Sequence, residues 1–267
     1  MLFTGQVCTE FRGCHSITDD INRMLQDSNV QEGYCVVCLE DHTTALGVTS
    51  FWDARGLDDL MDEIDKNFPA RIDFKNQETP FDAAGRVRAS VIGDSAMFLI
   101  KDGKLVLGSS QGIVMLEFDG PRVRHYTVNF VKCPIYMVKL SLKTEYKGMH
   151  DLTSSIRQEV IKSGVRDGIC HISMLHSTAG LLLCHGGEKQ REDVMDDIEN
   201  MVPTRADFKH RETASDAGGH VKTALTDSQV SVIIKDGKLM LNQEQAVVFA
   251  EYDGPRPRSY YVGIIAG

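Results

Sequence analysis

The sequence predicts an α+β protein made of two homologous units, each a mainly antiparallel sheet or sandwich with helices inserted between its strands. Three observations predict this architecture: the chain repeats itself, helix-like and strand-like segments alternate within each repeat, and the clearest local signals are β-hairpins. With 267 residues, of which 42% are hydrophobic and 25% charged, the chain has an ordinary globular composition and can bury a sizeable core.

The repeat is visible along most of the chain. Residues 42–124 match residues 176–258 without a gap at an offset of 134, and the motifs KDGKL and DGPR each occur once in either half. Near the start, TEFRGCH answers TEYKGMH at an offset of 135, so a one-residue slip is expected between Gly33 and His42.

These matches divide the chain into a first unit, 1–133, and a second unit, 134–267. The junction FVKCPIY has neither the Gly/Ser content nor the charge of a flexible linker. The two units are therefore expected to pack against each other.

Within the second unit, apolar residues at helical spacing predict helices over 151–164 and 191–202. Between them and after them, runs of strand-forming residues predict strands over 138–143, 168–175, 246–252 and 258–265. The Asp236-Gly237 pair between two apolar runs predicts a hairpin over 230–241.

Charge and apolar patterning narrow the class of protein. A formal net charge of −9 argues against a general nucleic-acid partner. No apolar run reaches the length of a membrane span, and the N-terminus lacks the pattern of a secretory signal, so a cytoplasmic protein without a membrane partner is expected. Cys35 and Cys38 lie three apart on an expected strand, where they would point to opposite faces as reduced thiols rather than share a metal or a disulfide.

The most distinctive polar motif is FKHRETASDAGGHVK, which places His210, Glu212, Asp216 and His220 within eleven residues. The parallel stretch in the first unit, FKNQETPFDAAGRVR, keeps both acids as Glu78 and Asp82, whereas Asn76 and Arg86 stand where the histidines would be. A third histidine, His176 in MLHSTAG, has His42 as its counterpart at the offset of 134.

Three histidines with one open position are typical of a catalytic metal site, so His176, His210 and His220 are candidate ligands. Asp216 or Glu212 could act as an oxygen ligand, as a partner that orients a ligand, or as a general base. The alternative is that these are surface or hydrogen-bonded histidines. Joint loss of two histidines from the first unit is the pattern expected of a decayed site, and it favours a site in the second unit.

Two further motifs carry charge. Arg256 and Arg258 alternate at strand spacing, as do Arg122 and Arg124, so each pair can present guanidinium groups to phosphate on one face; the alternative is a solvated strand end. The DDLMD stretch at 58–62 looks like a magnesium-diphosphate motif, but its acids fit better as the polar face of an amphipathic helix.

Four motifs taken together resemble one known family: HSTAG (176–180), HRETASDAGGHVK (210–222), KDGKL (235–239) and YDGPRPR (252–258). Each unit is similar to the YjbQ-type family, whose members are described as secondary thiamine-phosphate synthases. The resemblance implies an α+β fold, a homotrimer with sites near subunit interfaces, and a metal or anion pocket around the motif histidines, with zinc or magnesium as the divalent ion.

The resemblance also implies roles for particular residues. His176, Asp216 and Glu212 would be catalytic, His176, His210 and His220 would bind the metal, and Arg256, Arg258 and Lys222 would bind a small phosphorylated substrate. The implied reaction joins a pyrimidine diphosphate to a thiazole phosphate and releases diphosphate.

The chain departs from the family pattern in both units. Neither unit has the Asn-Glu-Asn run that usually follows the first histidine, and the Gly-Thr-Trp-Gln-Gly-Ile segment survives as GSSQGI at 108–113 but not at 242–247. Two hypotheses remain open. The chain is a metal-assisted transferase acting on small phosphorylated substrates with a site shared across units, or it is a non-catalytic trimeric scaffold that binds a metal or an anion.

Overall fold

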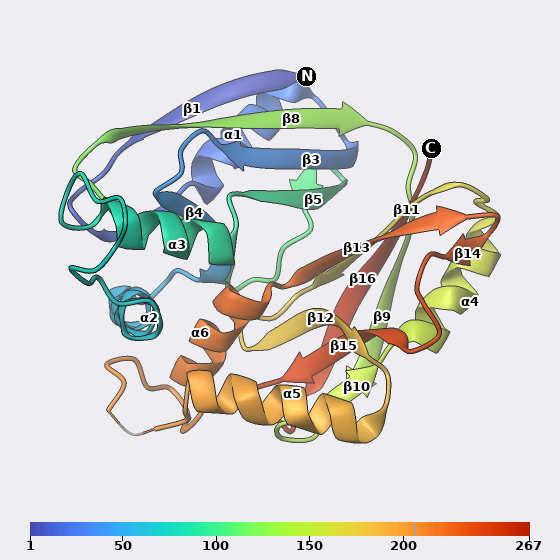
Figure 1. The fold of residues 1–267 in the computed structure, drawn as a ribbon. Coiled ribbons are helices and arrows are strands. Elements are labelled where there is room, and N and C mark those ends of the chain that lie inside the picture. The colour runs from blue at the N-terminus through green and yellow to red at the C-terminus, as the bar shows by residue number, and fades with distance from the viewer. Residues whose placement is uncertain (206) are drawn as a thin grey trace.

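The computed structural model describes residues 1–205 and 207–267 and shows two units with the same order of elements (Figure 1). The first unit contains β1 (Leu2–Cys8), β2 (Gly13–Ser16), α1 (Thr18–Ser28), β3 (Glu32–Leu39), β4 (Thr44–Ser50), α2 (Ala54–Asn67), α3 (Asp82–Ile92), β5 (Ser95–Lys101), β6 (Lys104–Leu105), β7 (Gln111–Glu117) and β8 (Val123–Lys132). The second contains β9 (Tyr136–Lys143), β10 (Met149–Asp151), α4 (Thr153–Ser163), β11 (Gly168–Met174), β12 (Ala179–His185), α5 (Glu188–Met201), α6 (Asp216–Thr226), β13 (Gln229–Lys235), β14 (Lys238–Leu239), β15 (Gln245–Glu251) and β16 (Pro257–Ala266).

Each unit folds into two antiparallel sheets. In the first unit a five-stranded sheet runs β1-β8-β3-β5-β6 and a three-stranded sheet runs β2-β7-β4; the second unit repeats both, as β14-β13-β11-β16-β9 and β10-β15-β12. Apolar side chains from both sheets and from α1 meet in the core of the first unit, for example Val37, Ile113 and Ile21. The predicted α+β class with mainly antiparallel sheet is therefore confirmed.

The elements expected in the second unit are present, with shifted ends. Helix α5 begins at Glu188, three residues before the expected start, because its first turn is polar and carries no apolar period. Cys35 is buried and Cys38 is exposed on β3, and both thiols are free, as the strand pattern predicts.

Strand pairing shows that the expected position of the one-residue slip was wrong. Ser50 at the end of β4 pairs with Gln111, and His185 at the end of β12 pairs with Gln245. The first members of these pairs differ by 135 positions and the second by 134, so the slip falls after β4, in the loop that leads to α2. This loop is one residue longer in the first unit than in the second.

The slip also changes the partner of His176. The backbone N–H of Phe118 donates to the Thr43 carbonyl, and that of Tyr252 donates to the Thr178 carbonyl, so Thr43 and Thr178 are equivalent. His176 therefore corresponds to Asp41 and not to His42. The similarity of HTTA to HSTA aligned the two histidines, whereas the sheet hydrogen bonds align the threonines.

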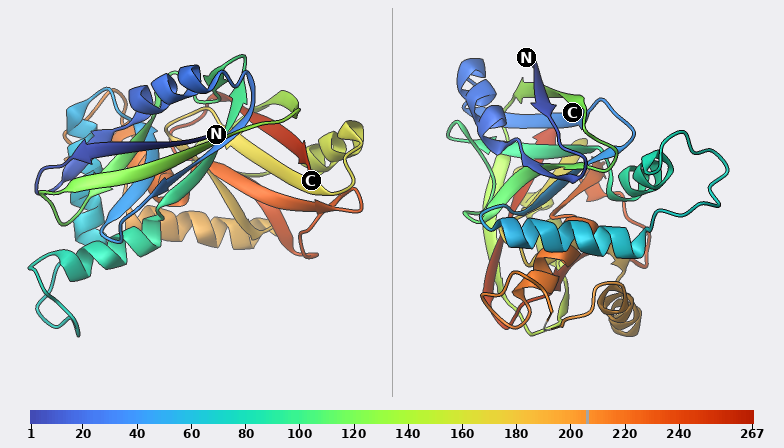
Figure 2. Two further views of the ribbon diagram at one scale, coloured as in Figure 1. Left: turned by 90° about the horizontal axis from the view of Figure 1, so that it is seen from above. Right: turned by 90° about the vertical axis from the view of Figure 1, so that its left-hand side faces the viewer.

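The units pack along a continuous contact in which α6 lies between its own β12 and the first unit's α2 and β4 (Figures 1 and 2). Leu60 and Ile64 of α2 meet Val221 of α6 in a shared buried cluster. Polar contacts add to this packing, because the Asp59 carboxylate accepts the backbone N–H groups of Lys209 and His210.

Asp59, in the DDLMD stretch, thus positions the segment that carries His210.

Among the described residues, no helix is both long and apolar enough to cross a membrane.

Candidate functional site

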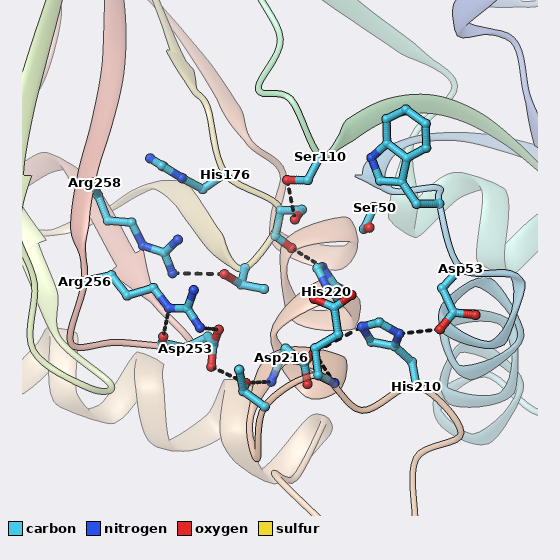
Figure 3. A pocket seen from close by; sticks show the side chains of 15 residues that line it. Ser50, Asp53, Ser110, His176, His210, Asp216, His220, Asp253, Arg256 and Arg258 are labelled. Carbon is cyan, nitrogen blue, oxygen red and sulfur yellow. Dashed lines mark hydrogen bonds and ion pairs between the residues drawn. The ribbon is translucent and has the colours of Figure 1, made fainter.

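A cavity of about 290 Å³ opens where the two units meet (Figure 3). The first unit lines it with Ser50, Trp52, Asp53 and Ser110, and the second unit supplies the other lining residues, including the three candidate histidines. The cavity is therefore shared between the units.

His210 is a buried side chain clamped between carboxylates of both units. Its Nδ1 lies 2.7 Å from Oδ2 of Asp53, the N-cap residue of α2, and its Nε2 lies 3.1 Å from Oδ2 of Asp216. Hydrogen bonds from Arg55 and from His210 hold the pKa of the Asp53 carboxyl well below its usual range. Asp53 therefore stays ionised and fixes the orientation of the His210 ring.

His220 faces the same point from α6. It follows Asp216 by four residues, which brings both side chains to one face of the helix. Its Nδ1 lies 2.8 Å from the Ser177 carbonyl oxygen, and its ring centroid lies 5.3 Å from that of His210. Burial lowers the pKa of His220, which favours the neutral ring that binds metals.

Asp216 is buried at the start of α6, where its carboxylate is oriented by backbone donors. Oδ1 accepts the N–H of Ala217 at 2.9 Å, and Oδ2 accepts the N–H of Glu212 at 2.9 Å. These bonds turn one oxygen toward the two imidazoles.

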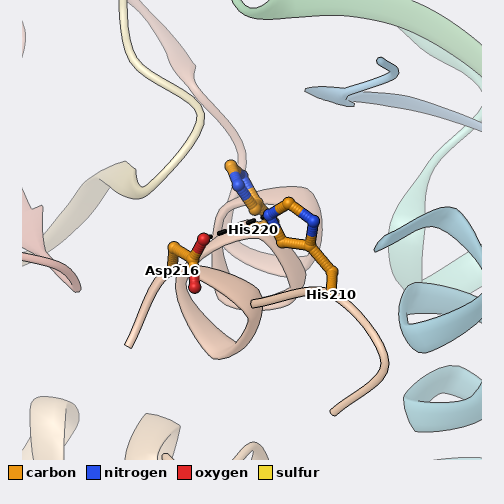
Figure 4. A group of neighbouring side chains, drawn as sticks. All are labelled: His210, Asp216 and His220. Atoms are coloured by element: carbon orange, nitrogen blue, oxygen red, sulfur yellow. Dashed lines mark ion pairs between the residues drawn. The ribbon is translucent and has the colours of Figure 1, made fainter. Parts of the chain in front are cut away.

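The ligand atoms of His210, Asp216 and His220 all lie within 4.8 Å of one another (Figure 4). Each imidazole has its Nδ1 against an oxygen acceptor, which leaves Nε2 to face the centre. The short distance from His210 Nε2 to Asp216 lacks hydrogen-bond geometry, so among the described residues this buried nitrogen has no hydrogen-bond partner. Imidazoles held in this way through their second nitrogen are typical of metal ligands, so these residues fit a divalent ion.

His176 lines the same cavity but does not join this group. Its Nε2 accepts the backbone N–H of Ser259 at 2.9 Å. Burial, followed by the charge of Arg258, lowers the pKa of His176 to about 4, so the ring is neutral near pH 7. The structure thus brings together two of the three histidines expected as ligands, with Asp216 in the third place.

The three candidate phosphate-binding residues have different surroundings. Arg258 is buried and bonded to Glu251 and to Thr178, although it lines the cavity. Arg256 is paired with Asp253 at 2.7 Å, but its side chain is 44% exposed. Lys222 is 1% exposed, is bonded to Glu199, and is not among the residues that line the cavity.

The equivalent position in the first unit is closed by an arginine. The Arg86 guanidinium lies 2.9 Å from Oδ2 of Asp82 and also donates to the Asn76 carbonyl. The aspartate retains its backbone donor, since Glu78 N–H bonds Oδ2 of Asp82 at 3.1 Å. A fixed positive charge therefore stands beside this aspartate, where the second unit has the imidazoles of His210 and His220.

Asp53, Trp52 and Ser110 were missed by reasoning from the sequence. Asp53 has a local signal as a helix N-cap, but its contact with His210 spans 157 positions. Only the packing of one unit on the other brings these residues to the histidines.

Comparison with known proteins agrees with the repeat. The family model described as UPF0047 protein YjbQ-like matches residues 5–133 and again residues 138–267. A UPF0047 protein of Methanocaldococcus jannaschii is 36% identical over 131 residues, which cover 49% of this chain and 91% of that protein. One from Archaeoglobus fulgidus is 32% identical over 126 residues, covering 47% of this chain and 98% of that protein.

A solved structure of an uncharacterised conserved protein of the yjbq/upf0047 family from Clostridium acetobutylicum is 33% identical, with a TM-score of 0.46, and covers 48% of this chain and 99% of that one. Each of these relatives corresponds in length to one unit. The chain belongs to the YjbQ-like UPF0047 family, whose unit it contains twice in tandem.

Proposed function

We propose that the shared cavity binds one divalent transition metal, zinc by preference, through His210, His220 and Asp216. With this metal bound, the protein would act on a small phosphorylated substrate. The observation that carries this proposal is the convergence of two anchored imidazoles and one carboxylate within 4.8 Å. Two nitrogen ligands and one oxygen ligand suit zinc, whereas magnesium prefers oxygen ligands alone. Three protein ligands facing a cavity leave a coordination position for substrate or water.

The negative charge of the cavity favours binding of a cation, and the bound cation would then allow an anionic substrate to bind. Its lining contains four carboxylates, Asp53, Glu212, Asp216 and Asp253, against two guanidinium groups, Arg256 and Arg258. With neutral histidines the formal charge is −2, which repels phosphate and which one divalent ion balances.

When bound, the metal would supply positive charge that stabilises negative charge developing on a phosphate leaving group. Arg256, which lines the same cavity with a half-exposed side chain, would bind a further phosphate oxygen. Glu212 is exposed at the cavity, where its carboxylate would stabilise the positive charge that a neutral attacking nitrogen acquires. The reaction suggested by the family resemblance is the joining of a pyrimidine diphosphate to a thiazole phosphate with release of diphosphate.

Metal content of protein purified without an affinity tag tests the proposal. Wild type should contain about one zinc per chain, and the variants His210→Ala and Asp216→Asn should lose it while keeping their circular dichroism spectra. The matched control is Asp82→Asn, which changes the equivalent aspartate of the first unit and should retain the metal. Equal metal content in all four proteins, or none in wild type, would contradict the proposed centre.

The second candidate is a scaffold that binds metal without turnover. Two of the three cationic side chains expected to bind a phosphate are already paired within the protein, Arg258 with Glu251 and Lys222 with Glu199, and this favours the scaffold. Zinc-loaded protein incubated with the two phosphorylated substrates distinguishes the candidates. Release of diphosphate supports the transferase, whereas thermal stabilisation by the substrates without any product supports the scaffold.

A further inference from the structure

The mouth of the cavity carries an aromatic side chain that the proposed metal chemistry does not use. Trp52 is the single tryptophan of the chain, lines the cavity from the first unit, and is 69% exposed. It directly precedes Asp53, whose carboxylate reaches His210 from the first unit. Tryptophan side chains are enriched at binding interfaces because they combine a large apolar face with a polar N–H group.

The indole is supported from behind. The rings of Phe51 and Trp52 are stacked, with centroids 4.2 Å apart and planes inclined by 30°. Phe51 in turn lies against the backbone of Gly112, where an added Cβ would stand only 2.2 Å from Phe51 Cδ1. Gly112 therefore makes room for Phe51, and Phe51 backs Trp52, so the two rings in the loop after β4 rest against β7 of the first unit.

The platform lies in the loop that distinguishes the two units. In the first unit β4 is joined to α2 by Phe51, Trp52 and Asp53, whereas in the second unit β12 is joined to α5 by Gly186 and Gly187 alone. The unit without the histidine pair thus carries the aromatic platform, and the unit with the histidine pair has glycines in its place. The two features face one cavity.

We infer that Trp52 determines ligand specificity by stacking on a flat aromatic or heteroaromatic ring, while the ligand's phosphate reaches Arg256 and the centre formed by His210, Asp216 and His220. This inference rests on the proposed function and assigns to Trp52 the recognition of the ring of its substrate. A cavity of about 290 Å³ is at the small end of ligand pockets, which are roughly 300–1,000 Å³, and suits a ligand no larger than a nucleoside monophosphate.

The test compares two probes that share a phosphate and a sugar but differ in the ring, adenosine 5′-monophosphate and ribose 5-phosphate. Each is titrated into zinc-loaded protein by calorimetry, and the emission of Trp52 is followed in parallel. Stacking of a base on an aromatic side chain should make the nucleotide bind roughly 5- to 150-fold more tightly, and it should change the emission.

Variants of Trp52 assign that difference. Trp52→Ala should reduce nucleotide affinity to that of ribose 5-phosphate, and Trp52→Phe should keep part of the preference because it keeps a ring. The matched control is Tyr146→Ala, which removes another exposed aromatic side chain outside this cavity and should leave both affinities unchanged.

Equal affinity for the two probes, or an unchanged preference in Trp52→Ala, would overturn the inference. Failure of both probes to bind zinc-loaded protein would also overturn it and would leave the metal centre intact. Zinc content is measured before any probe is added, so failure of the metal centre itself is recognised separately.

Discussion

Replacing Arg258 with methionine should destabilise the protein strongly while changing ligand affinity little. Glu251 is completely buried, and Arg258 donates to both of its carboxylate oxygens, from Nε at 2.6 Å and from Nη2 at 2.5 Å. Without the guanidinium, the Glu251 carboxylate keeps two donors among the residues that the structure describes, the Thr144 hydroxyl and the Asp253 N–H. Breaking a buried ion pair by removing one partner costs about 3–5 kcal/mol.

The loss should fall near the lower end of that range. Burial favours the neutral form of Glu251, but the hydrogen bonds of Arg258 and Thr144 outweigh burial and hold its pKa below the usual value. In the variant burial would dominate, so Glu251 would take up a proton and avoid a buried unpaired charge. The double variant Arg258→Met/Glu251→Leu should recover part of the stability, because well-packed apolar residues can replace a buried pair.

The first unit provides a matched control in Arg124→Met. Arg124 bonds Glu117 at 2.7 Å and Thr43 at 2.8 Å, as Arg258 bonds Glu251 and Thr178, but Arg124 does not line the cavity. Urea unfolding followed by circular dichroism should give comparable losses for both variants, and the affinity of folded protein for ribose 5-phosphate should stay within a few fold of wild type.

One result would refute this reasoning. If Arg258→Met lost less than about 1 kcal/mol of unfolding free energy yet bound ribose 5-phosphate tenfold more weakly, with Arg124→Met unaffected, Arg258 would be a phosphate ligand. That outcome would restore the role expected from the alternating pair Arg256 and Arg258.

Three further predictions concern the site, the pH dependence and the assembly. Asp53→Ser keeps a helix N-capping side chain but cannot reach His210, so zinc affinity measured by chelator competition should fall roughly 10- to 100-fold, and an unchanged affinity would exclude Asp53 as an orienting group. Burial lowers the pKa of His171 from 6.5 to about 4, so between these pH values the unfolded chain binds more protons than the folded protein. The contribution of neutral His171 to the free energy of unfolding, on the order of 3 kcal/mol, is therefore complete above pH 6.5 and is lost as the pH falls to 4. In urea unfolding, His171→Gln should show a shallower decline of stability over this window. The homotrimer implied by family resemblance should sediment with about three times the chain mass of 29.7 kDa, whereas a stable monomer at micromolar concentration would contradict it.

Local patterns were sufficient to predict most of the fold. Hydrophobic periodicity and the Asp-Gly turns depend on residues close together in the chain, so the antiparallel units and their helices could be recognised from the sequence. The position of the one-residue slip in the β4–α2 loop could not, because HTTA and HSTA are similar in sequence although their histidines are not structurally equivalent. Backbone hydrogen bonds at Thr43 and Thr178 set the true register.

The sequence alone showed that the second unit has His210 and His220 where the first has Asn76 and Arg86, because the two matching stretches can be compared residue by residue. Only the tertiary structure decided which atoms converge. Asp216 takes the third place beside the two histidines, because a helical turn of four residues aligns it with His220, whereas His176 bonds the backbone of β16. Asp53 and Trp52 reach the same cavity from the other unit because α6 packs against α2 and β4, a contact between distant segments that no local pattern encodes.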